Sequence, residues 1–263
     1  MILNNKFSSS KLIGLKIFTI VIFISVLTVN YLANAIPIGG ITTGQASESL
    51  PNLFTPIGFT FSIWGLIYLG LTFFCVFIFF IPIKYEGNYY IILQLFILNC
   101  ILNISWILAW HHRYILISLL IMIGLLITLI LISNKFDEFN SEKKLDYKIV
   151  ISQISFNIYF AWIVVATFAN FTTFLVHIQW NISILDPEIW TTILIFIITL
   201  LSMYIYNFKN SLAFIITVIW GIYGVYSKHI SMVYDYEYSI IIIATITSIL
   251  TLLIFTAVKK IIN

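Results

Sequence analysis

Long apolar runs follow one another along almost the whole chain, separated by short polar stretches. Each run holds about 20 residues of mainly Leu, Ile and Phe, enough for a helix to cross a hydrocarbon core of about 30 Å. The period-two alternation typical of an outer-membrane β-barrel is missing from the sequence. The pattern predicts an all-α integral membrane protein whose eight spans cover residues 14–35, 57–82, 89–110, 114–133, 149–171, 189–206, 212–227 and 239–258.

The composition supports a membrane protein. Hydrophobic residues make up 61% of the chain and charged residues only 9%, whereas a soluble domain carries about 25% charged residues. No segment reads as a separate soluble domain. Cys75 and Cys100 both lie inside apolar runs, which favours core packing over a disulfide or a metal site.

The thirteen Lys and Arg residues are spread unevenly over the loops. If the N-terminus lies inside, the outer loops hold Arg113 and Lys228, and the inner segments hold Lys6, Lys11, Lys16, Lys84, Lys135, Lys143, Lys144, Lys148, Lys209, Lys259 and Lys260. This asymmetry follows the positive-inside rule and predicts an even number of spans with both termini cytoplasmic. The net charge of +3 therefore reflects membrane sidedness, and no nucleic-acid partner is expected.

The N-terminal run has a second interpretation. Lys6, Lys11 and Lys16 precede an apolar stretch that ends at Ala33–Ala35, which is also the pattern of a cleavable signal peptide. The apolar stretch, residues 17–31, is at the upper end of the length for such a peptide. A retained first span is the favoured interpretation.

No Asp, Glu, Lys or Arg is expected in the interior of a span, where each would cost about 2.5–3.5 kcal/mol. Proton- or ion-coupled carriers and intramembrane acid–base enzymes usually need such groups, so these classes are disfavoured. The four histidines, which are His111, His112, His177 and His229, are expected to be interfacial rather than catalytic. A haem ligand would have to come from His111 or His112.

Three spans each carry a narrow stripe of Trp together with an amide or a phenol. Residues spaced by four, seven and eleven share one helix face. The stripes are Trp64, Tyr68 and Cys75 in the second span, Asn99, Asn103, Trp106 and Trp110 in the third, and Tyr159, Trp162, Ala166 and Asn170 in the fifth. The predicted orientation brings all three to the outer leaflet, beneath the loop of residues 36–55.

Two explanations of the stripes stay open. Trp and Tyr gather at membrane interfaces without any ligand, and an Asn between helices contributes about 0.6 kcal/mol per contact. For a single residue that structural explanation is the better one. For three stripes at one depth, a shared pocket for a flat, largely apolar ligand is favoured.

The same residues carry a resemblance to the TspO/MBR family, the translocator proteins or tryptophan-rich sensory proteins, which have five transmembrane helices. The matching motifs are Pro56 followed by Trp64–Tyr68 (Trp-x-x-x-Tyr), Asn103–Trp106 (Asn-x-x-Trp), and Tyr159 and Trp162 followed by Ala166 and Asn170. The resemblance covers residues 14–175 and is greatest to longer, bacterial-type members. The chain departs from the family at Gly58, where a Trp is common, at Ile158, where Pro is usual, and at Ile107, Leu108, Trp110 and His111, which replace prolines and paired phenylalanines.

The resemblance implies a TspO-like five-helix bundle over residues 1–175, followed by a three-helix transmembrane extension over residues 176–263. It implies a multi-pass protein of the bacterial inner membrane, surrounded by lipid, with a homodimer as one assembly. The implied ligand is a porphyrin or haem, or a sterol-like lipid, with no cofactor required. The implied role is that of a sensor, regulator or ligand carrier rather than an enzyme.

Two other functions stay open. One is a transporter of a small neutral or apolar solute, in which the extra spans complete a path. The other is an enzyme acting on tetrapyrroles, because tryptophans close to a bound photosensitiser can take part in light-dependent porphyrin breakdown.

The loop of residues 36–55 is rich in Gly, Pro and Thr, which favours turns and a fold-back. We expect it to lie over the pocket as a lid that includes Thr43, with Asn52 and Thr55 near the rim. The alternative is an ordinary surface turn. The predicted ligand-binding residues are Trp64, Tyr68, Asn99, Asn103, Trp106, Trp110, Tyr159, Trp162, Ala166 and Asn170, and no catalytic or metal-binding residue is predicted.

Overall fold

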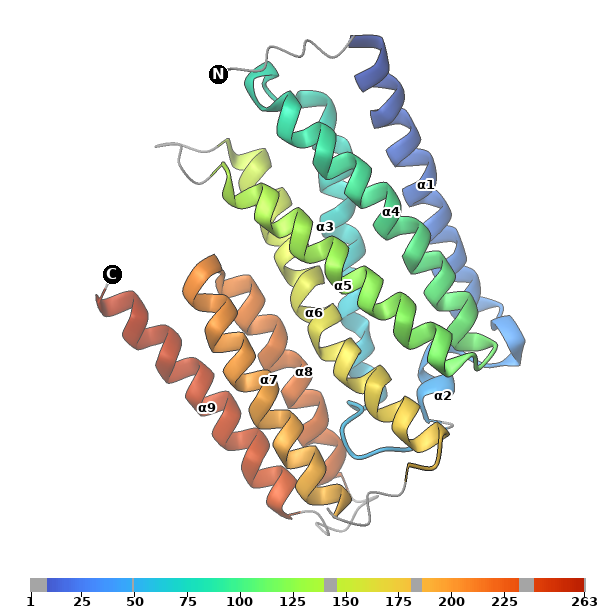
Figure 1. Ribbon diagram of the computed structural model, residues 1–263, viewed down its shortest axis with the longest axis vertical. Helices are drawn as coiled ribbons and strands as arrows, with labels where there is room; N and C mark the ends of the chain where they lie inside the picture. The colour runs from blue at the N-terminus through green and yellow to red at the C-terminus, as the bar shows by residue number, and fades with distance from the viewer. Residues whose placement is uncertain (1–8, 49, 140–145, 181–185, 232–238, 263) are drawn as a thin grey trace.

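A computed structural model describes residues 9–48, 50–139, 146–180, 186–231 and 239–262, and these ranges contain helices but no strand (Figure 1). The α-helices are α1 (Ser9–Ala35), α2 (Thr43–Glu48), α3 (Ile63–Phe77), α4 (Glu86–His111), α5 (Ile115–Asp137), α6 (Tyr147–His177), α7 (Pro187–Lys209), α8 (Leu212–Ile230) and α9 (Ser239–Ile262). Short 3₁₀ turns lie at η1 (Ile38–Gly40), η2 (Gly58–Ser62), η3 (Ile78–Phe80) and η4 (Ile83–Tyr85). Eight candidate spans lie in the described chain, so the predicted all-α membrane class is confirmed.

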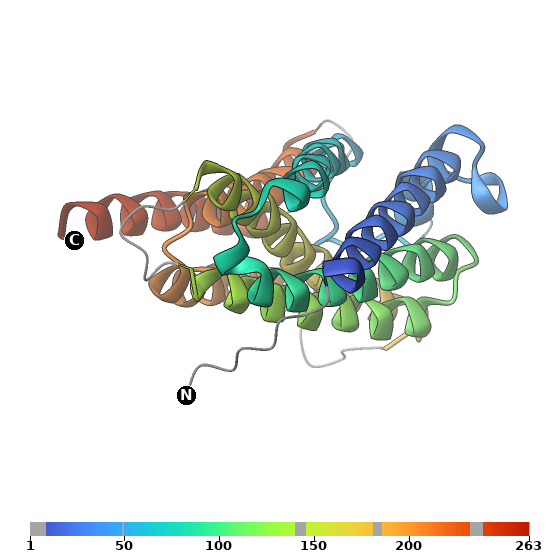
Figure 2. The ribbon, with the colours of Figure 1, turned by 90° about the horizontal axis from the view of Figure 1, so that it is seen from above.

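The helices form two groups that lie side by side. In the first group, α4 packs between α1 and α5, and α6 packs between α5 and α3. In the second group, α9 packs against both α7 and α8, and α8 is the helix that joins this group to α6. Figures 1 and 2 show α1 on one flank of the molecule and α9 on the other.

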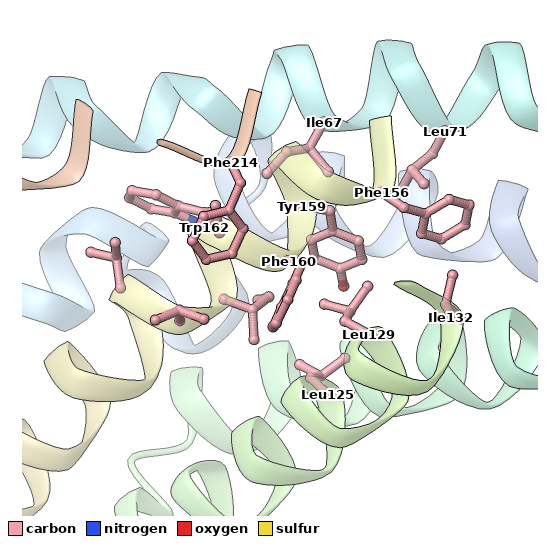
Figure 3. Close-up of a cluster of buried hydrophobic side chains, with 14 of the residues drawn as sticks. Ile67, Leu71, Leu125, Leu129, Ile132, Phe156, Tyr159, Phe160, Trp162 and Phe214 are labelled. Carbon is pink, nitrogen blue, oxygen red and sulfur yellow. The ribbon is translucent and has the colours of Figure 1, made fainter. Parts of the chain in front are cut away.

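The central helix of the whole arrangement is α6. In its most apolar stretch 67% of the residues are buried, against 28% in α1. Its side chains Phe156, Tyr159 and Phe160 lie among residues of α3 and α5, and Phe214 of α8 reaches the same cluster (Figure 3). Phe160 and Phe214 meet with ring centroids 5.1 Å apart. One helix therefore connects the two groups through a continuous aromatic core.

Hydroxyl side chains inside the spans bond to their own helices. Thr19, Ser152 and Thr199, for example, each donate to the carbonyl four residues earlier, at 2.7–2.8 Å. In the hydrocarbon core such a bond satisfies a hydroxyl group that has no water molecule to bond to. Many polar residues within the apolar runs are thus explained without a ligand.

Three helices begin at side-chain caps. Asp146, Asp186 and Ser211 accept hydrogen bonds from the first backbone N–H groups of α6, α7 and α8. The bond from the Lys148 backbone N–H lowers the pKa of the Asp146 carboxyl, and the Lys148 ammonium adds to this effect. These caps fix where the spans begin after each connecting segment.

The basic residues gather at one end of the described structure. The end opposite α2, where α1 begins and α9 ends (Figure 1), carries Lys11, Lys16, Lys84, Lys135, Lys148, Lys209, Lys259 and Lys260. There Lys209 of α7 bonds to Asp137 and Asn134 of α5. Lys6, Lys143 and Lys144 lie outside the described residues. The assignment of this end to the cytoplasm stays a prediction.

The helices α3 and α6 can approach closely because Gly70 has no side chain. A Cβ at Gly70 would lie 2.6 Å from Ser155 Oγ and 2.8 Å from Ser155 Cβ, whereas one at Gly14 would meet nothing. Gly70→Leu is expected to push the two helices apart and lower the free energy of unfolding by about 1–3 kcal/mol. Thermal unfolding in detergent measures this, with Gly14→Leu as the matched control. Equal stability of the two variants would contradict the close contact.

Candidate functional site

Two tryptophans and two tyrosines from α3 and α6 meet near the α2 end of the bundle. The Trp64 ring stacks on Tyr68, one turn along α3, with centroids 5.4 Å apart. It meets Trp162 of α6 edge-on at 6.5 Å, and Tyr159 at 5.7 Å. Phe61, just before α3, also meets Trp162 edge-on at 5.7 Å. The predicted stripes of the second and fifth spans therefore face one another.

A third helix completes an aromatic chamber. Trp106 and Trp110 of α4 stack on each other at 5.7 Å and line the same small cavity as Trp64 and Trp162. The complete lining of this tryptophan cavity is Ser47, Thr55, Pro56, Phe61, Trp64, Trp106, Trp110, Trp162, Val165, Ala166, Ala169, Asn170 and Thr173. Its volume is about 30 Å³, enough for a water molecule but not for an organic ligand.

Three hydrogen-bond donors at this cavity have no partner. Trp106 Nε1, Trp162 Nε1 and Asn170 Nδ2 are buried, and none of them bonds to a described residue. The carbonyl oxygen of the Asn170 side chain accepts from Ser118 Oγ at 3.3 Å. Buried donors are nearly always paired in proteins, and leaving one unpaired costs about 1–3 kcal/mol. The cavity is therefore suited to a molecule that brings acceptor atoms.

A much larger groove lies beside the tryptophan cavity, between α1 and α3. Its volume is about 730 Å³, within the 300–1,000 Å³ usual for ligand sites. Phe61 and Trp64 belong to both spaces. The α1–α3 groove is lined by Leu27, Asn30, Tyr31, Asn34, Ala35, Thr42, Thr43, Gly44, Gly58, Phe61, Trp64, Gly65, Tyr68 and Ile107.

Another cavity, of about 310 Å³, lies on the side of α8. It shares Ser47, Thr55, Pro56 and Phe61 with the tryptophan cavity, and Lys228 of α8 is part of its wall. Its other lining residues are Gly44, Pro51, Asn52, Ile57, Gly58 and Ser231. The tryptophan cavity is thus flanked by larger spaces on both sides.

Three of the predicted amide and phenol residues, Asn99, Asn103 and Tyr159, lie deeper and are already bonded. Asn99 Nδ2 donates to Thr128 Oγ1 at 2.8 Å, which ties α4 to α5. Asn103 Nδ2 donates to the Tyr159 hydroxyl at 3.2 Å, and Asn103 Oδ1 accepts from Asn30 of α1 at 2.9 Å. With Tyr68, three of these residues (Asn99, Asn103 and Tyr159) line a void of only about 10 Å³. Their observed contacts are those of residues that join helices.

The ten predicted ligand residues therefore divide into two levels. The upper level borders the tryptophan cavity or the groove and holds Trp64, Tyr68, Trp106, Trp110, Trp162, Ala166 and Asn170. The lower level holds Asn99, Asn103 and Tyr159. The single pocket expected from the sequence is instead a small cavity with larger neighbours.

The loop of residues 36–55 lies against the α4 end and the cavity. Trp110 Nε1 donates to the Thr43 carbonyl at 3.4 Å, and Thr43 Oγ1 is 3.5 Å from His111 Nε2. Asn52 Oδ1 accepts from the backbone N–H and the hydroxyl of Thr55, at 2.8 and 2.9 Å, and Asn52 Nδ2 donates to Thr173 of α6 at 3.2 Å. Thr43 borders the groove, Asn52 the α8-side cavity, and Thr55 both the α8-side and the tryptophan cavities.

Two histidines are enclosed by other parts of the protein. His111 and His229 lie at helix ends but are buried, 3% and 0% exposed. His111 Nδ1 is 2.8 Å from the Ile107 carbonyl, so both of its ring nitrogens face protein groups. Within the described ranges no group of three His, Cys, Asp or Glu residues could hold a metal ion.

Sequence reasoning missed the contributions of α1 and α8. Asn30 and Asn34 are spaced by four on the first span and border the groove, so the rule used for the other stripes would have found them. Lys228 and His229 were treated only as loop-edge residues. Nothing in their local sequence indicates that they reach the loop around Asn52.

A family model described as TSPO-like protein matches residues 16–258 of the chain. The match runs from α1 to near the end of α9 and so includes both helix groups. No curated protein and no solved structure matches the chain significantly.

The bond between Asn30 and Asn103 is expected to couple α1 to α4 energetically. In a double-mutant cycle of Asn30→Ala and Asn103→Ala, we expect a coupling free energy of about 0.6 kcal/mol, with 1.7 kcal/mol as the upper limit. Unfolding in detergent measures it. The control pair Asn30→Ala with Thr199→Ala, on α7, is expected to be additive. Additivity in both cycles would show that the bond does not hold α1.

Proposed function

The chain belongs to the TSPO-like protein family, and from this premise we propose that it is a membrane receptor for a flat, largely apolar ligand. Tetrapyrroles such as protoporphyrin or haem are the first ligand class, and sterol-like lipids are the second. The protein acts as a sensor, regulator or carrier of that ligand. Binding is the proposed activity, and no bond-making or bond-breaking step is part of it.

The observation that carries the proposal is the convergence of tryptophans around unpaired donors. Four indole rings from α3, α4 and α6 border one cavity, and flat aromatic walls favour stacking and edge contacts with a flat ligand. Two of those indoles and Asn170 offer N–H groups without partners among the described residues. A ligand with a planar apolar body and peripheral oxygen atoms satisfies both requirements.

The dimensions indicate how such a ligand fits. The tryptophan cavity, at about 30 Å³, is too small, whereas the adjoining groove of about 730 Å³ has the volume of a ligand site. Phe61 and Trp64 separate the two spaces. The ligand body would lie in the groove against Trp64 and Tyr68, and displacement of Phe61 would let one edge reach the donors of Trp162 and Asn170.

Tight packing below this level favours binding over passage. Phe74, Phe96 and Phe156 meet edge-on with centroids 4.9–5.4 Å apart, and all three are almost fully buried. A transported solute would need a route through this layer. The alternative role as a transporter would appear as solute flux in proteoliposomes that depends on a gradient.

Titration of protoporphyrin into purified protein is expected to quench tryptophan fluorescence. Trp64→Ala and Trp162→Ala should each weaken binding at least about tenfold, because central aromatic residues commonly contribute more than 1–2 kcal/mol. Trp180→Ala is the matched control, since Trp180 packs on Trp190 away from the cavities. Equal affinity of all variants and wild type would contradict the assigned site.

Acceptor atoms on the ligand are expected to contribute to its affinity in addition to the contribution of its aromatic ring. A porphyrin with only alkyl substituents should bind about tenfold more weakly than protoporphyrin, because it leaves the buried donors unpaired. Trp162→Phe keeps an aromatic ring and removes one N–H, so it should reduce this preference. The preference is measured as the ratio of the two dissociation constants. No preference in the wild type would contradict the role of the donors.

A further inference from the structure

The helix α8 holds the segment that forms one wall of the tryptophan cavity. This roof segment, Asn52–Thr60, lies between α2 and α3 and connects to the first turn of η2. Its residues Thr55 and Pro56 line the tryptophan cavity. Although α8 follows it by more than 150 residues in sequence, α8 makes most of the hydrogen bonds that reach its backbone from other described residues outside the segment.

Five hydrogen bonds join α8 to the roof segment. Lys228 Nζ donates to the carbonyls of Asn52 and Thr55, at 2.6 and 3.0 Å. His229 Nε2 lies 2.8 Å from the Leu53 carbonyl. Trp220 Nε1 donates to the Thr60 carbonyl at 2.9 Å, and the Gly224 carbonyl accepts from the Ile57 N–H at 3.2 Å. Both ends and the middle of the segment are therefore fixed by one helix.

The backbone of α8 also comes unusually close to the cavity wall. A Cβ at Gly224 would lie 2.3 Å from Thr60 Oγ1 and 2.8 Å from Pro56 Cβ, and one at Gly221 would lie 2.8 Å from Val165 Cγ1. Pro56 and Val165 both line the tryptophan cavity. Any side chain at these two glycines would press directly on the site, so the sequence of α8 sets the position of the wall.

Residues 52–57 of the roof segment need this support because they are not helical, whereas residues 58–60 belong to η2. The carbonyls of residues 52–57 lack the regular bonds of a helix, and close to the hydrocarbon region each requires a partner from the protein. Lys228, with three donor hydrogens on a flexible stem, can serve several carbonyls at once. On the opposite side of the loop, Thr43 meets Trp110 and His111 of α4 at 3.4 and 3.5 Å.

We propose that α8 is a positioning element of the ligand site, in which Lys228 fixes the roof segment against the tryptophans. The three C-terminal helices are then part of the binding site rather than a separate module. This inference rests on the proposed function for its effect on affinity, but its effect on the roof segment is independent of any ligand. Lys228 acts through the segment and need not touch the ligand.

The test compares Lys228→Met with Lys259→Met in the full-length protein. Lys259 makes the same kind of contact, donating to the carbonyls of Tyr206 and Asn207 at the end of α7, but it is far from the roof segment in the fold. Hydrogen exchange over residues 52–60 should become at least about tenfold faster in Lys228→Met and stay unchanged in Lys259→Met. Lys228→Arg, which keeps several donors, should restore slow exchange.

Affinity for protoporphyrin provides the second measurement. Lys228→Met should weaken binding at least about fivefold, mainly through faster dissociation, and Lys259→Met should not. Should Lys228→Met fail to fold, Trp220→Phe, which removes the donor to Thr60 and keeps an aromatic ring beside Phe59, should still speed exchange at that end of the segment.

The two measurements separate the two proposals. Faster exchange in Lys228→Met together with no porphyrin binding by the wild type would overturn the proposed function and support the role of α8 in holding the roof segment. The role of α8 would be overturned if the wild type binds porphyrin while Lys228→Met leaves both hydrogen exchange and affinity unchanged and Trp220→Phe leaves hydrogen exchange unchanged. Loss of affinity in Lys259→Met equal to that in Lys228→Met would also overturn it, because the effect would then be one of general stability.

Discussion

The hydrocarbon core of a membrane offers no hydrogen bonds, so polar groups within the spans must find partners inside the protein. Hydroxyls such as Thr19 and Ser152 bond to their own helices, and the amides of Asn99 and Asn103 bond between helices. Against this background, unpaired donors stand out. Trp106, Trp162 and Asn170 lie around one cavity without partners among the described residues. Single groups such as the Tyr89 and Tyr206 hydroxyls also lack a partner there, so it is the gathering of three donors at one cavity that distinguishes the aromatic chamber.

The same constraint explains why the second helix group is attached where it is. The non-helical residues 52–57 expose carbonyls that a helix would have satisfied, and α8 supplies donors to them through Lys228 and His229. Attachment also runs through the core, where Phe214 meets Phe160. The family match to residue 258 includes these helices, and the division into a five-helix bundle and a three-helix extension stays a prediction.

Much of the fold could be predicted because the relevant signals are local. Apolar run length locates the spans, and a spacing of three or four residues places Trp106 with Trp110 and Trp162 with Ala166 on shared faces. What each stripe residue does depends on a neighbour distant in sequence. Asn103 and Trp106 both belong to the stripe of the third span. The side chain of Asn103 is bonded to Asn30, whereas Trp106 Nε1 has no partner among the described residues. Lys228 is 176 residues from the carbonyl of Asn52, a distance over which no periodicity carries information.

The two sides of the loop are held by different contacts. The roof segment is fixed by five bonds from α8, whereas on the α2 side Thr43 meets Trp110 and His111 at 3.4 and 3.5 Å. The donors of the tryptophan cavity are buried, and the space beside them has room for no more than about one water molecule. Under the proposed function, a ligand acceptor would take the place of such a water at the donors, and binding would cost the desolvation of the ligand and the displacement of Phe61. Such preorganisation favours a rigid ligand with few, well-placed acceptors over a flexible apolar chain.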